Sequence, residues 1–155
     1  MEEITRSEED KGAIELAIFL KFVAMSGLEI LPSSATKRSP PEPDILCALA
    51  SGEVLAFELA EACAPEFAEA TSNAINKGVS VAWGADVSSA TVLKKLAKSY
   101  VTAHPTELLL YTNGRTALPD EHICGDIAPL LHNGLGPFKR VWFMGDSVHL
   151  LAGVI

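Results

Sequence analysis

The sequence predicts an α/β fold: a single domain with a central mixed β-sheet flanked by helices. Its 155 residues are 48% hydrophobic and 21% charged, enough for one well-buried core and too short for two ordinary domains. Long apolar runs with helical character alternate with short apolar runs bounded by turn residues. Two of the short runs are apolar almost throughout, as strands covered on both faces are. We therefore expect one domain over residues 1–155.

The first predicted helix covers residues 11–25, where Ala, Ile, Leu and Phe are dense. Ser7 followed by Asp10 gives a weak capping-box signal before it, and Gly27 is placed to end it. The run LEIL at 28–31 predicts the first strand. The segment after it is rich in proline and small polar residues, and it predicts a loop.

A β-hairpin is predicted next, with strands at 44–50 (DILCALA) and 53–60 (EVLAFELA) joined by a Ser-Gly turn. The apolar character of both runs predicts a central place in the sheet. Asp44 at the start of the first strand and Glu58 near the end of the second are therefore unexpected, because a buried carboxylate is costly without a partner.

Helical and strand patterns continue to the end of the chain. The predicted elements are a helix at 65–76, an ambiguous run at 79–84, a helix at 88–100, a strand at 106–114, a helix interrupted by Gly and Pro at 120–134, and, within 138–154, one strand followed by a possible second across a Gly-Asp turn.

The formal charge of −8 is distributed unevenly along the sequence. Residues 39–76 contain seven acidic side chains and no Lys or Arg. Such a segment repels a polyanion unless cations intervene. The basic residues gather in small groups elsewhere, so the sequence predicts local basic spots and no continuous basic stripe.

The cellular compartment is predicted from the N-terminus and the cysteines. The first residues are acidic, and no apolar run is long enough for a membrane span, so neither export nor membrane insertion is indicated. Cys47, Cys63 and Cys124 are odd in number and form no CxxC pair, which fits reduced thiols used in packing. We expect a cytoplasmic protein.

The two hairpin acids lie fourteen positions apart. Asp44 follows a proline, and Glu58 is followed by Leu59 and Ala60. Strand residues two apart point the same way, so Glu58 and position 60 share a face, and Asp44 can reach the same rim of the hairpin. Two carboxylates that converge at a sheet edge form an oxygen site suited to Mg²⁺.

Together with the order of elements, this spacing resembles the PD-(D/E)xK nuclease superfamily, which has a restriction-endonuclease-like αβββαβ core. The resemblance covers about residues 8–113. It implies Mg²⁺-dependent hydrolysis of phosphodiester bonds in DNA or RNA, with the metal held by Asp44, Glu58 and the carbonyl of Leu59. It also implies a glutamate from the first helix, and Glu15 is the best-placed acid there.

The chain departs from the family at Ala60, where the motif has lysine. Three explanations are open. The role has passed to another cation, with Lys94, Lys95 and Lys98 nearest in sequence. Glu61 substitutes as an auxiliary acid, which needs a bulge or strand end to turn it toward the site. In the third explanation the site binds metal poorly and the protein no longer cuts.

Each of these acids also has an ordinary structural explanation. Asp44 after proline is a common turn residue, Glu15 fits a solvated helix face, and Glu58 can pair with a lysine or lie at an exposed edge. A function of a different class is a catalytically inactive nuclease-like domain that acts as an interaction module. It would form a homo-oligomer through the apolar C-terminal segment 138–155. A binder or enzyme acting on small molecules is a third class that the fold alone leaves open.

Overall fold

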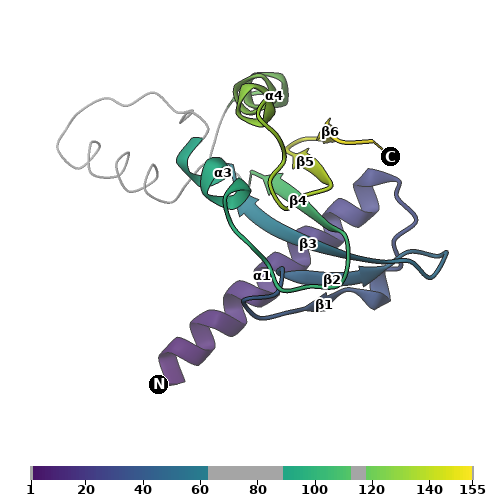
Figure 1. Cartoon of the computed structure of the whole chain (residues 1–155). Helices are drawn as coiled ribbons and strands as arrows, with labels where there is room; N and C mark the ends of the chain where they lie inside the picture. Colours follow the sequence, from purple (N-terminus) through teal and green to yellow (C-terminus); the bar gives the residue numbers. More distant parts are fainter. Residues whose placement is uncertain (1, 63–88, 113–117, 155) are drawn as a thin grey trace.

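The computed structural model describes residues 2–62, 89–112 and 118–154. Its strands form one six-stranded mixed sheet in the order β1-β2-β3-β4-β5-β6 (Figure 1). The strands are β1 Thr36–Lys37, β2 Ile45–Ala48, β3 Val54–Glu61, β4 Thr106–Tyr111, β5 Arg140–Met144 and β6 Val148–Ala152. The predicted α/β class and the central mixed sheet are confirmed.

The first three strands form an antiparallel meander, β3, β4 and β5 are parallel, and β6 returns antiparallel to β5. Parallel neighbours need crossover connections. Helix α3 lies in the connection from β3 to β4, and α4 in that from β4 to β5. The helices are α1 Glu2–Ser26, η1 Pro32–Ser34, α3 Ser89–Leu96, α4 Asp120–Ile127 and η2 Ala128–Leu131.

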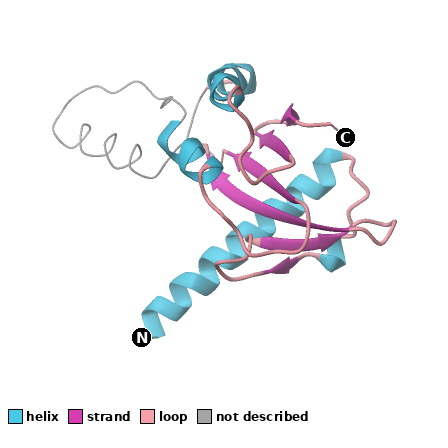
Figure 2. Ribbon diagram, viewed as in Figure 1, coloured by secondary structure: helices cyan, strands magenta, loops and turns pink. Residues whose placement is uncertain are grey.

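Helices cover both faces of the sheet (Figure 2). Helix α1 packs on one face through Phe19 and Phe22, whose rings lie 5.0 and 5.6 Å from that of Phe57 in β3. Helices α3 and α4 pack on the other face through Val92 and Ile123. The two cores lie on opposite sides of β3, as strand alternation requires.

The alternation predicted for β3 is confirmed. Leu55, Phe57 and Leu59 belong to the core under α1, whereas Ala60 belongs to the core under α3 and α4. Glu58 and Ala60 therefore share the face that α3 covers. This placement decides which element supplies a cation to Glu58.

The predicted strand at 28–31 is wrong. In that run only Ile30 pairs with the sheet, through an isolated bridge to Leu49. Pro32 follows, lacks a backbone N–H and begins a 3₁₀ turn, so the pairing cannot continue. The first strand, β1, instead lies within the segment predicted to be a loop.

The other predicted elements keep their type and change their ends. The hairpin is confirmed, with Ile45 opposite Phe57, and its connection is longer than two residues. Helix α1 begins earlier than predicted and α3 ends earlier, at Leu96. The last segment forms two strands around the Gly-Asp turn. The predictions for 65–76 and 79–84 fall outside the described residues.

None of the helices in the described ranges has the length and apolar character needed to cross a membrane.

Candidate functional site

The two hairpin acids lie together where β2 begins and β3 ends. The backbone N–H of Asp44 donates to Glu58 Oε1 at 3.0 Å. In return, the N–H of Leu59 donates to Asp44 Oδ2 at 3.0 Å. Each carboxylate thus accepts a backbone hydrogen bond from the other strand, just past the Ile45–Phe57 pair at which the regular β2–β3 pairing ends. The prediction that Asp44 and Glu58 reach one rim of the hairpin is confirmed.

Glu58 is buried, with 3% of its surface exposed, and helix α3 supplies its counter-charge. Lys95 Nζ and the Tyr100 hydroxyl each donate to Glu58 Oε2 at 2.8 Å. Of the three lysines named from the sequence, Lys95 is therefore the one that reaches the acid. Lys94 is exposed, and the Lys98 ammonium lies 5.4 Å from the centre of the Tyr100 ring.

A second lysine joins the cluster from β1. Lys37 Nζ lies 3.2 Å from Asp44 Oδ1 and 3.3 Å from Glu15 Oε2. Glu15, on α1, is 6% exposed, and its other oxygen lies 3.8 Å from Lys11 Nζ. The structure thus brings Glu15 to the same cluster as Asp44. Sequence reasoning missed Lys37 because its segment was interpreted as a loop.

Glu61 does not share the face of Glu58. The pairing of β3 with β4 runs in regular register from Ala56 to Glu61, without a bulge. The Glu61 side chain therefore points to the face opposite that of Glu58. The bulge that would turn it toward the site is not present in the paired residues of β3.

An open groove of about 610 Å³ lies beside Lys37, Asp44 and Glu15. Its basic side chains are positioned to attract an anion, while the two carboxylates lie next to Lys37. The lining residues are Lys11, Gly12, Ala13, Glu15, Leu16, Lys37, Arg38, Ser39, Pro40 and Asp44.

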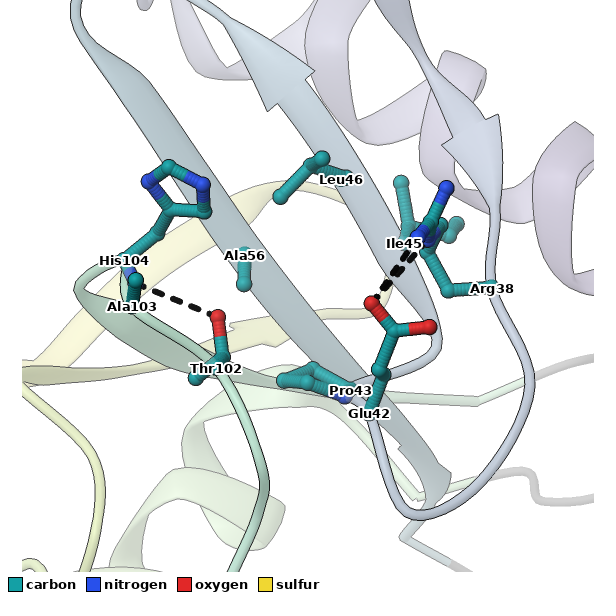
Figure 3. Close-up of a pocket in the computed structure, with 9 residues that line it drawn as sticks. All are labelled: Arg38, Glu42, Pro43, Ile45, Leu46, Ala56, Thr102, Ala103 and His104. Carbon is teal, nitrogen blue, oxygen red and sulfur yellow. Dashed lines mark hydrogen bonds and ion pairs between the residues drawn. The ribbon is translucent and has the colours of Figure 1, made fainter.

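A smaller hollow of about 160 Å³ lies on the other side of Arg38 (Figure 3). Figure 3 shows Arg38 and His104 on opposite sides of it, with Leu46 and Ala56 between them. Arg38 donates from Nε and Nη2 to Glu42 Oε1, at 3.2 and 3.0 Å. Arg38 lines both cavities, and its ion pair with Glu42 lies in the smaller one.

The surroundings of the two hairpin acids shift their pKa values in opposite directions. Burial, followed by the neighbouring charge of Asp44, raises the pKa of Glu58 above its ordinary value. Burial also opposes ionisation of Asp44, but the hydrogen bonds from Leu59 and with Glu58, together with Lys37, outweigh it and lower the pKa of Asp44. Asp44 is thus the acid that ionises first.

Two other groups in the cluster titrate above their ordinary ranges. Burial and then the charge of Asp44 raise the pKa of Glu15. Burial, together with the hydrogen bond to Glu58, raises the pKa of the Tyr100 hydroxyl, which therefore remains a donor at neutral pH. The cluster contains one readily ionised carboxyl group between two that resist ionisation.

The donor set fits a hard divalent cation at the position of the Lys37 ammonium. Asp44 Oδ1 and Glu15 Oε2 both converge on that position, beside the open groove. Mg²⁺ is commonly held by one or two carboxylates and retains several waters. The buried Glu15 Oε2 is in ion-pair contact with Lys37 Nζ at 3.3 Å, so a cation that replaces Lys37 would find it as a ligand.

The carbonyl of Leu59 faces the same edge. Along β3, the N–H groups of Ala56 and Ala62 point to β4, so the backbone of Leu59 points to the Asp44 side. Glu58 is less available, because Asp44, Lys95 and Tyr100 already donate to its two oxygens. In the described ranges, no three His, Cys, Asp or Glu side chains surround a metal position. The Lys37 ammonium lies between Asp44 and Glu15, so metal binding at that point requires Lys37 to move.

A second polar cluster, which the sequence did not predict, lies at the turn between β5 and β6. His149 Nε2 is 2.9 Å from Asp120 Oδ2 and 3.1 Å from Ser147 Oγ. One ring nitrogen makes both contacts, so the imidazole cannot relay a proton between the two groups as in a hydrolase triad. Asp120 also accepts the N–H groups of Asp146 and Ser147, each at 3.0 Å. The cluster therefore holds the turn.

A fully buried acid, Glu107, lies in the core under α1. Its Oε1 accepts the indole N–H of Trp142 at 2.7 Å and lies 3.0 Å from Arg140 Nε. Burial, with a contribution from Glu107, raises the pKa of Cys47 to about 12. The cysteine is thus an inert packing residue, as predicted. Glu107 lies among core side chains and lines none of the cavities described above.

Comparison with known proteins identifies no relative: no protein-family model, no curated protein and no solved structure matches the chain.

Proposed function

We propose that the chain is a divergent nuclease of the PD-(D/E)xK superfamily that hydrolyses phosphodiester bonds of nucleic acid with the help of a divalent metal. The observation that carries the proposal is the contact of Lys95 with Glu58. Position 60 shares a face with Glu58, and α3 packs on that face. Lys95 therefore brings an ammonium group to the side of β3 from which a lysine at position 60 would project.

The order of elements supports the proposal. Among the described residues, helix α1, strands β1 to β3, helix α3 and strand β4 come in the order expected of an αβββαβ core. Glu15 on α1, Asp44 before β2 and Glu58 in β3 are the acids that the resemblance assigns to the site. All three lie within one connected set of contacts.

The groove supplies an entry for a phosphodiester. Its cations, Lys11, Lys37 and Arg38, offset the repulsion that the acidic segment would exert on a polyanion. Lys37 has the central role. In the free protein its ammonium group neutralises Asp44 and Glu15, and on substrate binding it can swing away to pair with a phosphate oxygen instead. Substrate and metal would thus replace Lys37 together.

The residues that would hold Mg²⁺ are Asp44, Glu15 and the carbonyl of Leu59, with Glu58 as the further acid that the resemblance implies. A metal bound there neutralises phosphate charge and lowers the pKa of a water molecule. Asp44 remains anionic at neutral pH because its pKa is lowered. Lys95 holds Glu58 in place and would add positive charge on the Glu58 side of the proposed site.

The test is a cleavage assay on plasmid and single-stranded DNA and RNA with Mg²⁺ or Mn²⁺. We expect Asp44→Asn and Lys95→Met to lose activity by roughly a hundredfold or more, as removal of a charge-stabilising group does. Lys94→Met, one position along α3 and exposed, should retain it. Equal activity of the two lysine variants would overturn the role of Lys95.

A second candidate function, the catalytically inactive interaction module, is favoured by a specific observation. Both oxygens of Asp44 and both of Glu58 already have donors, so the cluster is a complete ion-pair network. Titration calorimetry separates the two candidates. Mg²⁺ binding to the wild type that disappears in Asp44→Ala supports the nuclease, whereas no binding and no cleavage supports the module.

A further inference from the structure

The outward face of helix α1 is almost entirely apolar from Gly12 to Ser26. Within that range the sequence has two charged residues, Glu15 and Lys21, and Glu15 is buried. The exposed residues are Ala13, Ile14, Ala17, Leu20, Lys21, Ala24 and Met25. Ile14 is 53% exposed, and Leu20 is 38% exposed. A surface helix of a globular protein normally places polar residues on this side.

The residues of this face follow the spacing of a helix-pairing seam. Asp10, Ala13, Ala17, Leu20 and Ala24 are separated by alternating steps of three and four, which keeps them on one side of a helix. Three of them are alanines, so the backbone of a second helix can approach closely. The larger apolar side chains of one helix can then pack between the alanines of the other.

We propose that this face is a dimer interface on which α1 of a second copy of the chain packs antiparallel. A two-fold axis near the middle of the seam brings Ile14 of one copy against Ala17 of the other. It also brings Lys21 of one copy to Asp10 of the other. Both are exposed, and neither has an ion-pair partner in the described part of the chain.

Charge along α1 favours this orientation. The sequence before Gly12 is acidic on balance, with five acids, Glu2, Glu3, Glu8, Glu9 and Asp10, against two bases, Arg6 and Lys11. The second half of the helix contains Lys21 and no exposed acid. In an antiparallel pair each acidic half lies beside the other copy's lysine, whereas a parallel pair sets acids against acids.

The length of the helix gives an independent argument. Its N-terminal part projects past the edge of the sheet at β1 (Figure 1). A projecting helix has little stability without a packing partner. Antiparallel pairing lays the projecting part of each copy along the C-terminal half of the other, so the second copy fits this surface better than a partner that covers the apolar patch alone.

The C-terminal segment is less suited to self-association. Residues 140–144 are buried as β5, and 148–152 are half-buried as β6 in the protein's own sheet. The apolar surface that was expected to join copies is thus largely used within one copy. The inference about α1 does not depend on the proposed nuclease function.

Sedimentation velocity over a concentration series tests the interface through a charge exchange. We expect a concentration-dependent dimer, weakened roughly tenfold by Lys21→Glu or by Asp10→Lys, because each reversal affects two symmetry-related ion pairs. The double variant should recover most of the wild-type affinity. Lys94→Glu on α3 is the matched control and should leave the affinity unchanged.

Two results would overturn the inference. One is a wild type that is monomeric at every concentration. The other is a dimer that persists in Leu20→Lys, a change at an exposed helix position that leaves the monomer folded. Loss of the dimer in Val154→Lys but not in Leu20→Lys would place the interface in the C-terminal segment instead.

Discussion

The contact between Lys95 and Glu58 gives a quantitative prediction about stability. Lys95→Met removes the ammonium group and keeps most of the apolar stem that packs on the sheet. It leaves a 3% exposed carboxylate with two donors, Asp44 N–H and Tyr100 OH, in place of three. The loss is that of one charge-assisted hydrogen bond in a largely buried site.

Such a bond contributes about 1.5–3 kcal/mol to the free energy of unfolding. Lys95 retains 23% side-chain exposure, so the larger cost of leaving one member of a fully buried pair without its partner does not apply. For a chain of this length, the loss lowers the melting temperature by about 5–10 °C. Lys94→Met, at an exposed position, should change the free energy by less than about 0.5 kcal/mol.

The loss also depends on pH. The pKa of Glu58 is raised in the folded protein, so its ionisation costs stability as the pH rises through that raised value. Lys95 lowers this cost, since it favours the charged form. The penalty of Lys95→Met is therefore largest at neutral pH and shrinks as the pH falls and Glu58 takes up a proton.

Urea unfolding of wild type, Lys95→Met and Lys94→Met at several pH values measures these free energies. A similar small loss in both lysine variants would show that the ion pair contributes nothing to stability. A loss in Lys95→Met that stays constant with pH would show that Glu58 is not the group through which Lys95 acts.

Three further predictions concern other parts of the fold, and all can be measured by urea unfolding. Gly145→Ala should destabilise the protein by about 1–3 kcal/mol, because the new methyl group would overlap the Asp120 carboxylate that holds the turn. Gly125→Ala, in open space on α4, should stabilise it by about 0.5–1 kcal/mol. Stability changes of the same sign for both variants would contradict the geometry. Asp120→Asn should cost about 1–2 kcal/mol at neutral pH, because the amide can accept only one of two N–H donors. The pKa of Asp120 is lowered in the folded protein, so the carboxylate stabilises the fold above the ordinary carboxyl range, and this stabilisation disappears as the pH falls through the lowered pKa. A cost of Asp120→Asn that grows in acid would refute this. Trp142→Phe should cost about 1–3 kcal/mol by leaving the fully buried Glu107 without its indole donor, and a neutral effect would show that the bond is dispensable.

Much of the fold follows from the apolar pattern. The hairpin, the strand that follows it and the alternation of β3 were predicted, because residues with two covered faces leave a strong signal in the sequence. The run at 28–31 misled for a physical reason: it is apolar enough for a strand, but Pro32 ends its pairing after one bridge. Conversely, β1 is an edge strand of only two residues, too short for an alternating apolar pattern that could have predicted it.

The candidate site was predictable in its acids and only partly in its cations: Lys95 was one of three lysines named from the sequence, and Lys37 was missed. Asp44 and Glu58 stand out because carboxylates are rare inside apolar strands. Lys37 and Lys95 lie on an edge strand and on a helix surface, where lysine is common and carries no local signal. Their role depends on tertiary placement, which neither spacing nor composition encodes.

Three different elements supply charge to the rim of the hairpin: helix α1, strand β1 and helix α3. A substitution that removes a cation from β3 can therefore be compensated from a neighbouring element without disturbing the acids. A linear motif records which strand position holds a charge, and it fails once that charge is exchanged between elements. Searches for related proteins should accordingly compare the positions of charged groups around the rim in space, regardless of the order in which the chain supplies them.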